Sequence, residues 1–82
     1  MRTIRKAVND DALIVNDFDD VVTASTWSMG GLTASRADYG GKWTSVIAEG
    51  GTLGTAYKVT NTVTLDSFAV IERSVMVELV TK

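Results

Sequence analysis

Carboxylates near the start of the chain are the residues whose type and spacing first suggest chemistry. Five of them fall within residues 10–20, namely Asp10, Asp11, Asp17, Asp19 and Asp20. Ca²⁺ prefers convergent carboxylate oxygens, but no Gly at the bend and no Glu at the right distance downstream completes an EF-hand loop. We expect a solvated turn in which Asp side chains accept hydrogen bonds from backbone amides. The sequence therefore predicts no metal site, although it leaves calcium binding by this cluster open.

Groups suited to catalysis are few. The chain has no His and no Cys, so only carboxylates, Lys, Tyr and hydroxyls remain to exchange protons or attack a substrate. There is no Gly-x-Ser-x-Gly elbow, and neither Ser35 nor Ser45 has a base signature nearby. The Gly-rich segment at residues 50–55 lacks the spacing and the Lys of a phosphate-binding loop. We expect no enzymatic activity and no cofactor.

Aromatic side chains suggest a second kind of chemistry, the stacking of sugars on an exposed ring. The chain has two Trp, two Tyr and two Phe, and a small core needs the large apolar area of Trp27 and Trp43. Burial in the core is therefore the expected role, for Trp27 above all. A carbohydrate-binding module, kept as an alternative, predicts that Trp43 and Tyr39 are exposed to solvent.

The elements that position these residues are predicted to be strands. Gly pairs at 30–31, 40–41 and 50–51 recur at regular intervals, as turns do between the short strands of sandwiches and barrels. β-branched residues dominate between the turns, and no amphipathic helix competes. The sequence predicts a small all-β antiparallel sandwich of about six to seven strands. The predicted strands are 12–15, 21–29, 32–35, 42–49, 56–65 and 68–80, with turns at 36–41, 50–55 and 66–67.

Alternation along the two longest predicted strands indicates the core face. In the first of them one face carries the residues Tyr57, Val59, Asn61, Val63 and Leu65. If this face is buried, Asn61 needs hydrogen-bond partners. In the last strand, Val75, Val77 and Leu79 share a face with Arg73. Trp43, Val46 and Ile47 are further candidates for burial.

Residues 1–10 carry three basic side chains and little apolar surface. We expect them to form an N-terminal arm that is ordered only against a neighbour, followed by one domain over residues 11–82. Met76 and Val80 lie on the predicted solvent face of the last strand but are too apolar for it. The predicted partner-binding residues are therefore Arg2, Arg5, Lys6, Met76 and Val80.

Charge and hydropathy exclude several classes of partner. The net charge is −2, and no basic stripe suits nucleic acid. The longest apolar runs, Ala12–Val15 and Phe68–Ile71, are too short to cross a membrane. Because no apolar signal stretch follows the first residues, we expect synthesis in a cytoplasm. A small chain without disulfide or metal is expected to gain stability from oligomerisation or docking.

Four segments occur in a recognisable order: Thr23–Ser28, Gly31–Thr33, Gly50–Asn61 and Glu72–Ser74. In this order the sequence resembles a family of small Ig-like phage structural proteins described as fibre–tail adaptor proteins. The resemblance implies an Ig-like sandwich and a non-enzymatic virion protein that docks tail components through its arm and sheet edges. It also implies other virion proteins (tail, fibre or capsid) as partners, a homo-oligomer in the particle, and assembly in the host cytoplasm.

The sequence departs from the family pattern at two places. An Asp-Pro-Asp-Ala-type start is absent, and Asp66–Ile71 replaces a Gly-containing turn. The docking position therefore stays open, and a capsid decoration protein is the alternative within the same class.

Overall fold

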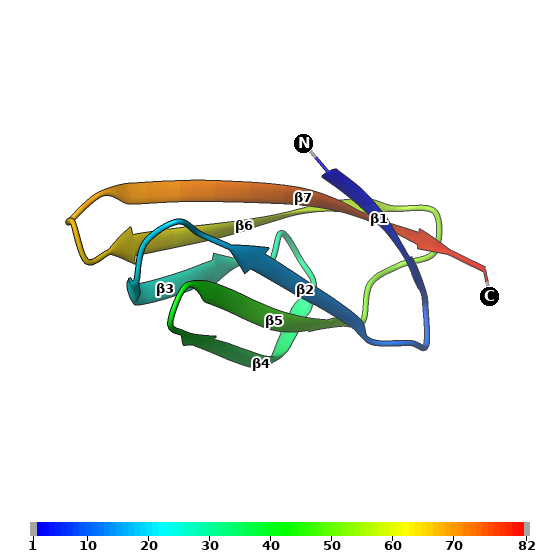
Figure 1. Ribbon diagram of the computed structural model, residues 1–82. Helices are drawn as coiled ribbons and strands as arrows, with labels where there is room; N and C mark the ends of the chain where they lie inside the picture. Colours follow the sequence, from blue (N-terminus) through cyan, green and yellow to red (C-terminus); the bar gives the residue numbers. More distant parts are fainter. Residues whose placement is uncertain (1, 82) are drawn as a thin grey trace.

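The computed structural model describes residues 2–81, which form seven strands in two sheets and no helix (Figure 1). Met1 and Lys82, at the ends of the expected arm and domain, lie outside the described residues. The predicted all-β sandwich is confirmed. The strands are β1 (Arg2–Ala7), β2 (Ala12–Asp17), β3 (Val22–Ser28), β4 (Thr33–Gly40), β5 (Trp43–Glu49), β6 (Ala56–Leu65) and β7 (Val70–Val80).

The order of the strands in the two sheets resembles the immunoglobulin pattern except at β1, which pairs with β7 and not with β2. One sheet has the order β1-β7-β6-β3, and the other has the order β2-β5-β4. Immunoglobulin sandwiches likewise place the second, fifth and fourth strands in one sheet and the third, sixth and seventh in the other. Every pairing is antiparallel except that of β1 with β7, which is parallel.

Residues 2–7 are a strand of the sandwich, whereas the sequence predicted a separate arm over residues 1–10. β1 pairs with β7 from Arg2 opposite Val75 to Ala7 opposite Val80. The strand is hard to predict from its polar composition because one of its inward positions is taken by Lys6, which is only 2% exposed, while Ile4 packs against the core. The Lys6 Nζ donates hydrogen bonds to three backbone carbonyl oxygens, those of Ala7 at 3.2 Å, Val8 at 3.2 Å and Gly50 at 2.9 Å.

Strand β4 extends through residues 36–40, where the sequence predicted a turn. Its residues are almost all exposed, since β4 is an edge strand paired only with β5 among the residues described. Apolar alternation is therefore absent from its sequence. The Gly pair at 40–41 led instead to the prediction of a turn. The Tyr39 hydroxyl donates to the Thr23 carbonyl oxygen at 3.2 Å and so links β4 to β3 across the open side of the sandwich.

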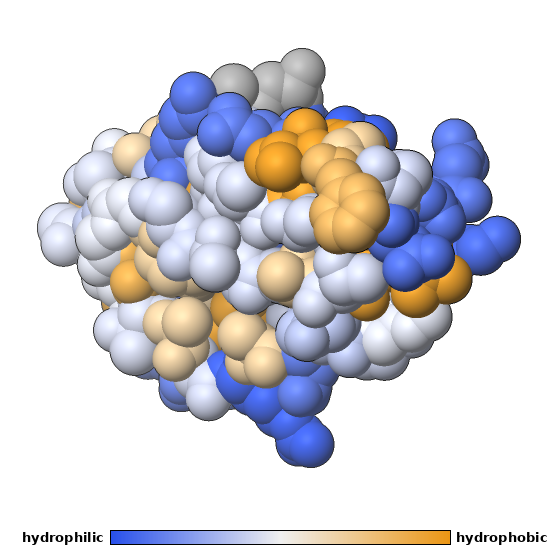
Figure 2. Space-filling model, turned by 90° about the vertical axis from the view of Figure 1, so that its left-hand side faces the viewer, coloured by the Kyte–Doolittle hydropathy of each residue, from blue (hydrophilic) through white to orange (hydrophobic). Residues whose placement is uncertain are grey.

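Loops gather at the two ends of the sandwich. The end that faces the viewer in Figure 2 holds the β2–β3 loop, the β4–β5 turn and the β6–β7 turn, and we call it the β6–β7 end. Its loops are joined by backbone hydrogen bonds, from Phe18 to Lys42, from Val22 to Gly41 and from Asp66 to Val21, each at 2.8 Å. The opposite end holds the loop over residues 50–55.

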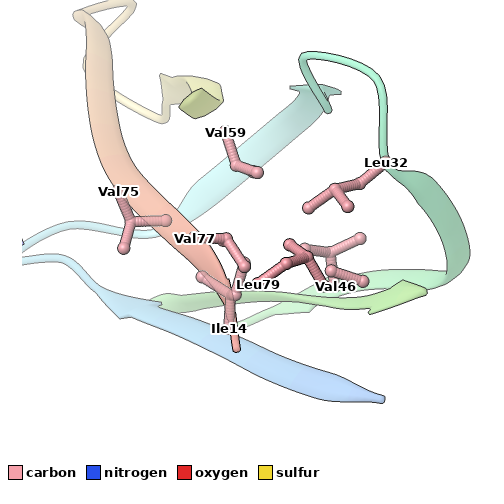
Figure 3. Close-up of a cluster of buried hydrophobic side chains, with 8 residues drawn as sticks. Ile14, Leu32, Val46, Val59, Val75, Val77 and Leu79 are labelled. Carbon is pink, nitrogen blue, oxygen red and sulfur yellow. The ribbon is translucent and has the colours of Figure 1, made fainter. Parts of the chain in front are cut away.

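Two groups of buried apolar side chains form the core between the sheets. The larger group comes from both sheets and is shown in Figure 3; its buried members are Ile14, Leu32, Val46, Ala48, Val59, Val75, Val77 and Leu79. Trp27 packs against this group. The smaller group lies toward the β6–β7 end and consists of Phe18, Val22, Val63 and Leu65. The inward faces predicted for residues 57–65 and 75–79 are confirmed.

The prediction that Trp43 lies in the core is wrong. Thr44, Val46 and Ala48 are the buried residues of β5, so Trp43 points outward and is 41% exposed. Its ring lies against Gly40, where a Cβ atom would come within 3.1 Å of Trp43 Cζ2. Because side chains alternate along a strand, the register that buries Val46 must expose Trp43.

Between the two apolar groups lies a buried amide. Asn61 is fully buried, and its Oδ1 accepts hydrogen bonds from Thr44 Oγ1 at 2.6 Å and Asn16 Nδ2 at 3.3 Å. Its Nδ2 donates to Ser25 Oγ and to the Thr26 carbonyl oxygen, both at 2.9 Å. The partners come from both sheets, so this one side chain joins the sheets by hydrogen bonds as well as by packing.

Candidate docking surfaces

Three of the five predicted partner-binding residues come together on the outer face of β1 and β7. Met76 and Val80 are half-buried there, and Arg5 lies between their positions, opposite Glu78 in the register. The Arg5 Nε and Glu78 Oε2 atoms are 3.8 Å apart on the surface, and such an exposed pair contributes only about 0–1 kcal/mol. We call this surface the β1–β7 face.

The other two predicted residues do not join that face. Alternation along β1 places Arg2 and Lys6 on the side opposite to Arg5. Arg2 is exposed, whereas the Lys6 ammonium is enclosed by the chain's own carbonyl oxygens. Lys6 therefore supports the fold and does not belong to the surface that a partner could touch.

A second apolar surface covers the outer side of the smaller sheet. Leu13 on β2 lies opposite Ile47 on β5, and Val15 follows Leu13 on the same face. Trp43 continues this face at the start of β5. Leu13 and Trp43 are exposed and Ile47 is half-buried. We call this surface the β2–β5 face.

The third apolar surface is at the β6–β7 end. The sequence predicted that the last strand starts at Phe68, but β7 begins at Val70, and Phe68 is in the turn with 88% of its surface exposed. Val70 and Val21 are exposed beside this turn. Figure 2 shows apolar atoms raised at the upper part of this end, with hydrophilic groups on both sides. The run Phe68–Ile71 was visible in the sequence, but it was predicted to be the start of the last strand.

Within the acidic cluster, Asp20 serves a turn in the way that the sequence predicted for the cluster. The Asp20 Oδ1 atom accepts a hydrogen bond from the Val21 amide at 2.8 Å. That bond, together with contacts to Ser67 and the charge of Lys42, lowers the pKa of the Asp20 carboxyl below its ordinary value. Within residues 2–81, no three acidic side chains converge in a way that could hold a metal ion.

The opposite end carries a shallow hollow of about 240 Å³, lined by Gly54, Thr55, Ala56, Glu78, Leu79 and Val80. This volume is below the range of about 300–1,000 Å³ that is typical of small-molecule sites. Beside it, the Tyr57 hydroxyl accepts a hydrogen bond from the Thr52 amide at 2.9 Å. Hydrogen bonds with Thr52 lower the pKa of the Tyr57 phenol, and the bond with the Thr52 side chain has a larger effect than the bond with its amide.

Tyr39 and Trp43 are both exposed, as the carbohydrate-binding alternative predicted. They do not build a common platform, however. Tyr39 lies opposite the buried Thr44 in the register and so points to the inner side of its sheet, whereas Trp43 points outward. A sugar that stacks on Trp43 would therefore not reach the Tyr39 ring.

The geometry defines a small structural β-sandwich whose apolar surface side chains are exposed on the β2–β5 face and at the β6–β7 end and half-buried on the β1–β7 face. The chain matches, over residues 9–78, the family model described as podophage GP4 fiber-tail adaptor protein gp77, and it belongs to this family. It is therefore a phage structural protein, and the resemblance seen in the sequence is confirmed. A search of curated proteins found no match. Within residues 2–81 there is no helix of the length and apolarity needed to cross a membrane.

Proposed function

We propose that this protein is a fibre–tail adaptor that joins tail and fibre components of the virion by protein contact and catalyses no reaction. The family match over residues 9–78 carries the proposal. The surface supports it, because the exposed apolar side chains of the β2–β5 face and the half-buried ones of the β1–β7 face suit macromolecular contact better than a small ligand. Assembly in the host cytoplasm, with several copies in each particle, belongs to the same proposal.

Two features of the fold suit the docking of virion proteins. The sheets end in the edge strands β1, β3, β2 and β4, and an edge strand can accept a strand from a partner. The β1–β7 face adds Arg5, Met76 and Val80 beside one of these edges. Contact there combines main-chain hydrogen bonds with apolar area, and the exposed charges set orientation more than affinity.

The copy number in purified particles tests this function. Quantitative mass spectrometry of the particle should find few copies relative to the major capsid protein, as a ring at the tail would have. As many copies as capsid subunits would instead show a capsid decoration protein. Absence from the particle would contradict the virion role and leave sugar binding through Trp43, which sugar titrations of its fluorescence would detect.

A double variant tests the β1–β7 face. Met76→Ser with Val80→Ser removes its apolar area and should lower incorporation into particles. The matched control, Thr60→Ala with Thr64→Ala, alters the outward side chains of β6 in the same sheet. Equal incorporation of both variants would show that the β1–β7 face is not a docking surface.

A further inference from the structure

Phe68 is the most exposed large apolar side chain in the described part of the chain, with 88% of its surface accessible. Its backbone has a φ of 67°, in the left-handed region. A bulky aromatic residue rarely adopts this conformation because its Cβ atom crowds the backbone. The sandwich thus keeps a large apolar ring in a strained position where it packs against almost nothing. Strain of this kind is typical of sites with a function outside the fold.

The turn that carries Phe68 is fixed rather than loose. The Phe68 amide donates to the Leu65 carbonyl oxygen, and the Leu65 amide donates to the Ala69 carbonyl oxygen, both at 2.9 Å. The Asp66 amide donates a hydrogen bond to the Val21 carbonyl oxygen at 2.8 Å, which joins this turn to the β2–β3 loop. A rigid turn loses little conformational entropy when it docks.

The ring does not stand alone. Val70 is 64% exposed and Val21 is 43% exposed on the two segments that this bond joins. Beneath them lies the smaller core group, where the Arg73 guanidinium carbon sits 5.4 Å from the centre of the Phe18 ring. Phe68, Val70 and Val21 therefore form a small apolar tip on a packed base, and we call it the Phe68 tip.

Acidic side chains flank the Phe68 tip. Asp66 lies in the same turn, and Asp19 and Asp20 lie in the β2–β3 loop. Asp20 contacts Ser67 in the β6–β7 turn, and Lys42 is the nearby cation that acts on it. Three carboxylates against the two cations Lys42 and Arg73 leave the surroundings of the tip net negative, and a complementary surface has an apolar hollow bordered by Lys or Arg.

We propose that the Phe68 tip inserts into an apolar pocket with a basic border on a partner protein of the virion. The inference rests on the proposed adaptor function and assigns one contact of it to the β6–β7 end. Phe68 fills the pocket, Val70 and Val21 exclude water around it, and the carboxylates of Asp19 and Asp66 face the basic border. Such a central aromatic anchor carries a large share of binding energy in protein interfaces.

Binding of the purified chain to virus particles assembled without it tests the proposal. Phe68→Asn removes the ring but keeps a residue that tolerates a left-handed backbone. It should raise the protein concentration that half-saturates the particles by about tenfold or more, as the loss of an anchor residue does. The matched control is Leu53→Asn, since Leu53 is an exposed apolar residue in the loop at the opposite end, and it should bind like the wild type.

The acidic border has its own test. Asp19→Asn with Asp66→Asn should slow association and flatten its dependence on salt concentration, because charges at an interface act mainly on encounter. Asp20 is left unchanged because its carboxylate caps the Val21 amide. An unchanged salt dependence would show that the partner's border is not basic.

The outcomes separate this inference from the adaptor function. If wild-type protein does not bind the particles at all, the adaptor function fails. If wild-type and Phe68→Asn protein bind equally well, the adaptor function stands and the tip inference is overturned. If light scattering shows that the isolated chain self-associates and that Phe68→Asn abolishes this, the tip contacts a second copy, which also overturns the proposed partner. Circular dichroism should show that the Phe68→Asn and Leu53→Asn variants both fold.

Discussion

At the scale of single residues, Asn61 is the polar side chain on which the core most depends. All four hydrogen-bonding positions of its amide are used, by Thr44, Asn16, Ser25 and the Thr26 backbone. The alternation of residues 57–65 predicted that Asn61 points inward and needs partners. The identity of those partners could not be predicted, because they come from β2, β3 and β5, which only the folded topology brings together.

Asn61→Ala should lower the free energy of unfolding by about 2–4 kcal/mol, because it creates a cavity and leaves buried donors and acceptors unpaired. Thr62→Ala is the control, since its side chain is the next one along β6 and points outward; a change below about 1 kcal/mol is expected there. Urea denaturation measures both. Similar losses in the two variants would contradict the role given to Asn61.

Alanine variants of Lys6 and Arg5, neighbours on β1, give a second matched comparison of stability. Lys6→Ala should cost about 1–3 kcal/mol of unfolding free energy, because it leaves the carbonyl oxygens of Val8 and Gly50 without their donor. Arg5→Ala removes only an exposed ion pair and should cost less than about 1 kcal/mol. Urea denaturation of the isolated chain checks this pair. Equal, small effects would mean that β1 is not docked on β7 in solution.

At the scale of elements, the sequence predicted strands wherever apolar residues alternate. β6 was predicted with its observed bounds, and the inward residues of β7 were predicted as well. β1 and residues 36–40 of β4 were missed for the same physical reason, since both belong to edge strands with few buried apolar side chains. Their pairing depends on main-chain hydrogen bonds, which leave no hydrophobic pattern. The Phe68 tip was missed because residues 68–71 were predicted to be the start of the last strand.

The loop between β5 and β6 gives a prediction at this scale. Gly51 has a φ of 100°, and a Cβ atom there would lie 2.9 Å from Leu32 Cδ2 and from Leu79 Cγ. Gly51→Ala should therefore cost about 2 kcal/mol or more in unfolding free energy, from backbone strain and overpacking together. Gly54→Ala, with a φ of 81° and open space around it, should cost about 1 kcal/mol from strain alone. Thermal or urea unfolding can compare them.

At the scale of the whole molecule, stability should respond to acid but change little near neutral pH. The chain has no His, so no side chain has an ordinary pKa near 6.5. The pKa of Asp20 is lower in the folded protein than its ordinary 3.8. A depressed pKa means that the carboxylate stabilises the fold above pH 3.8 and that this stabilisation is lost as the pH falls through the folded value.

Urea denaturation of the wild type and of Asp20→Asn across the acid range checks this expectation. The wild type should be the more stable protein above about pH 4, and the difference should shrink as the pH falls further. A difference that stays constant down to the most acid pH would show that the Asp20 charge does not contribute.

The parallel pairing of β1 with β7 determines how the domain responds to mechanical force. The two strands run in the same direction, from Arg2 beside Val75 to Ala7 beside Val80. Tension between the start of β1 and the end of β7 therefore pulls the strands past each other. All the hydrogen bonds between them then bear the force together in shear, whereas peeling an antiparallel hairpin from its open end breaks bonds one at a time. Pulled from its two ends, the domain should therefore resist extension until the whole β1–β7 pairing breaks at once.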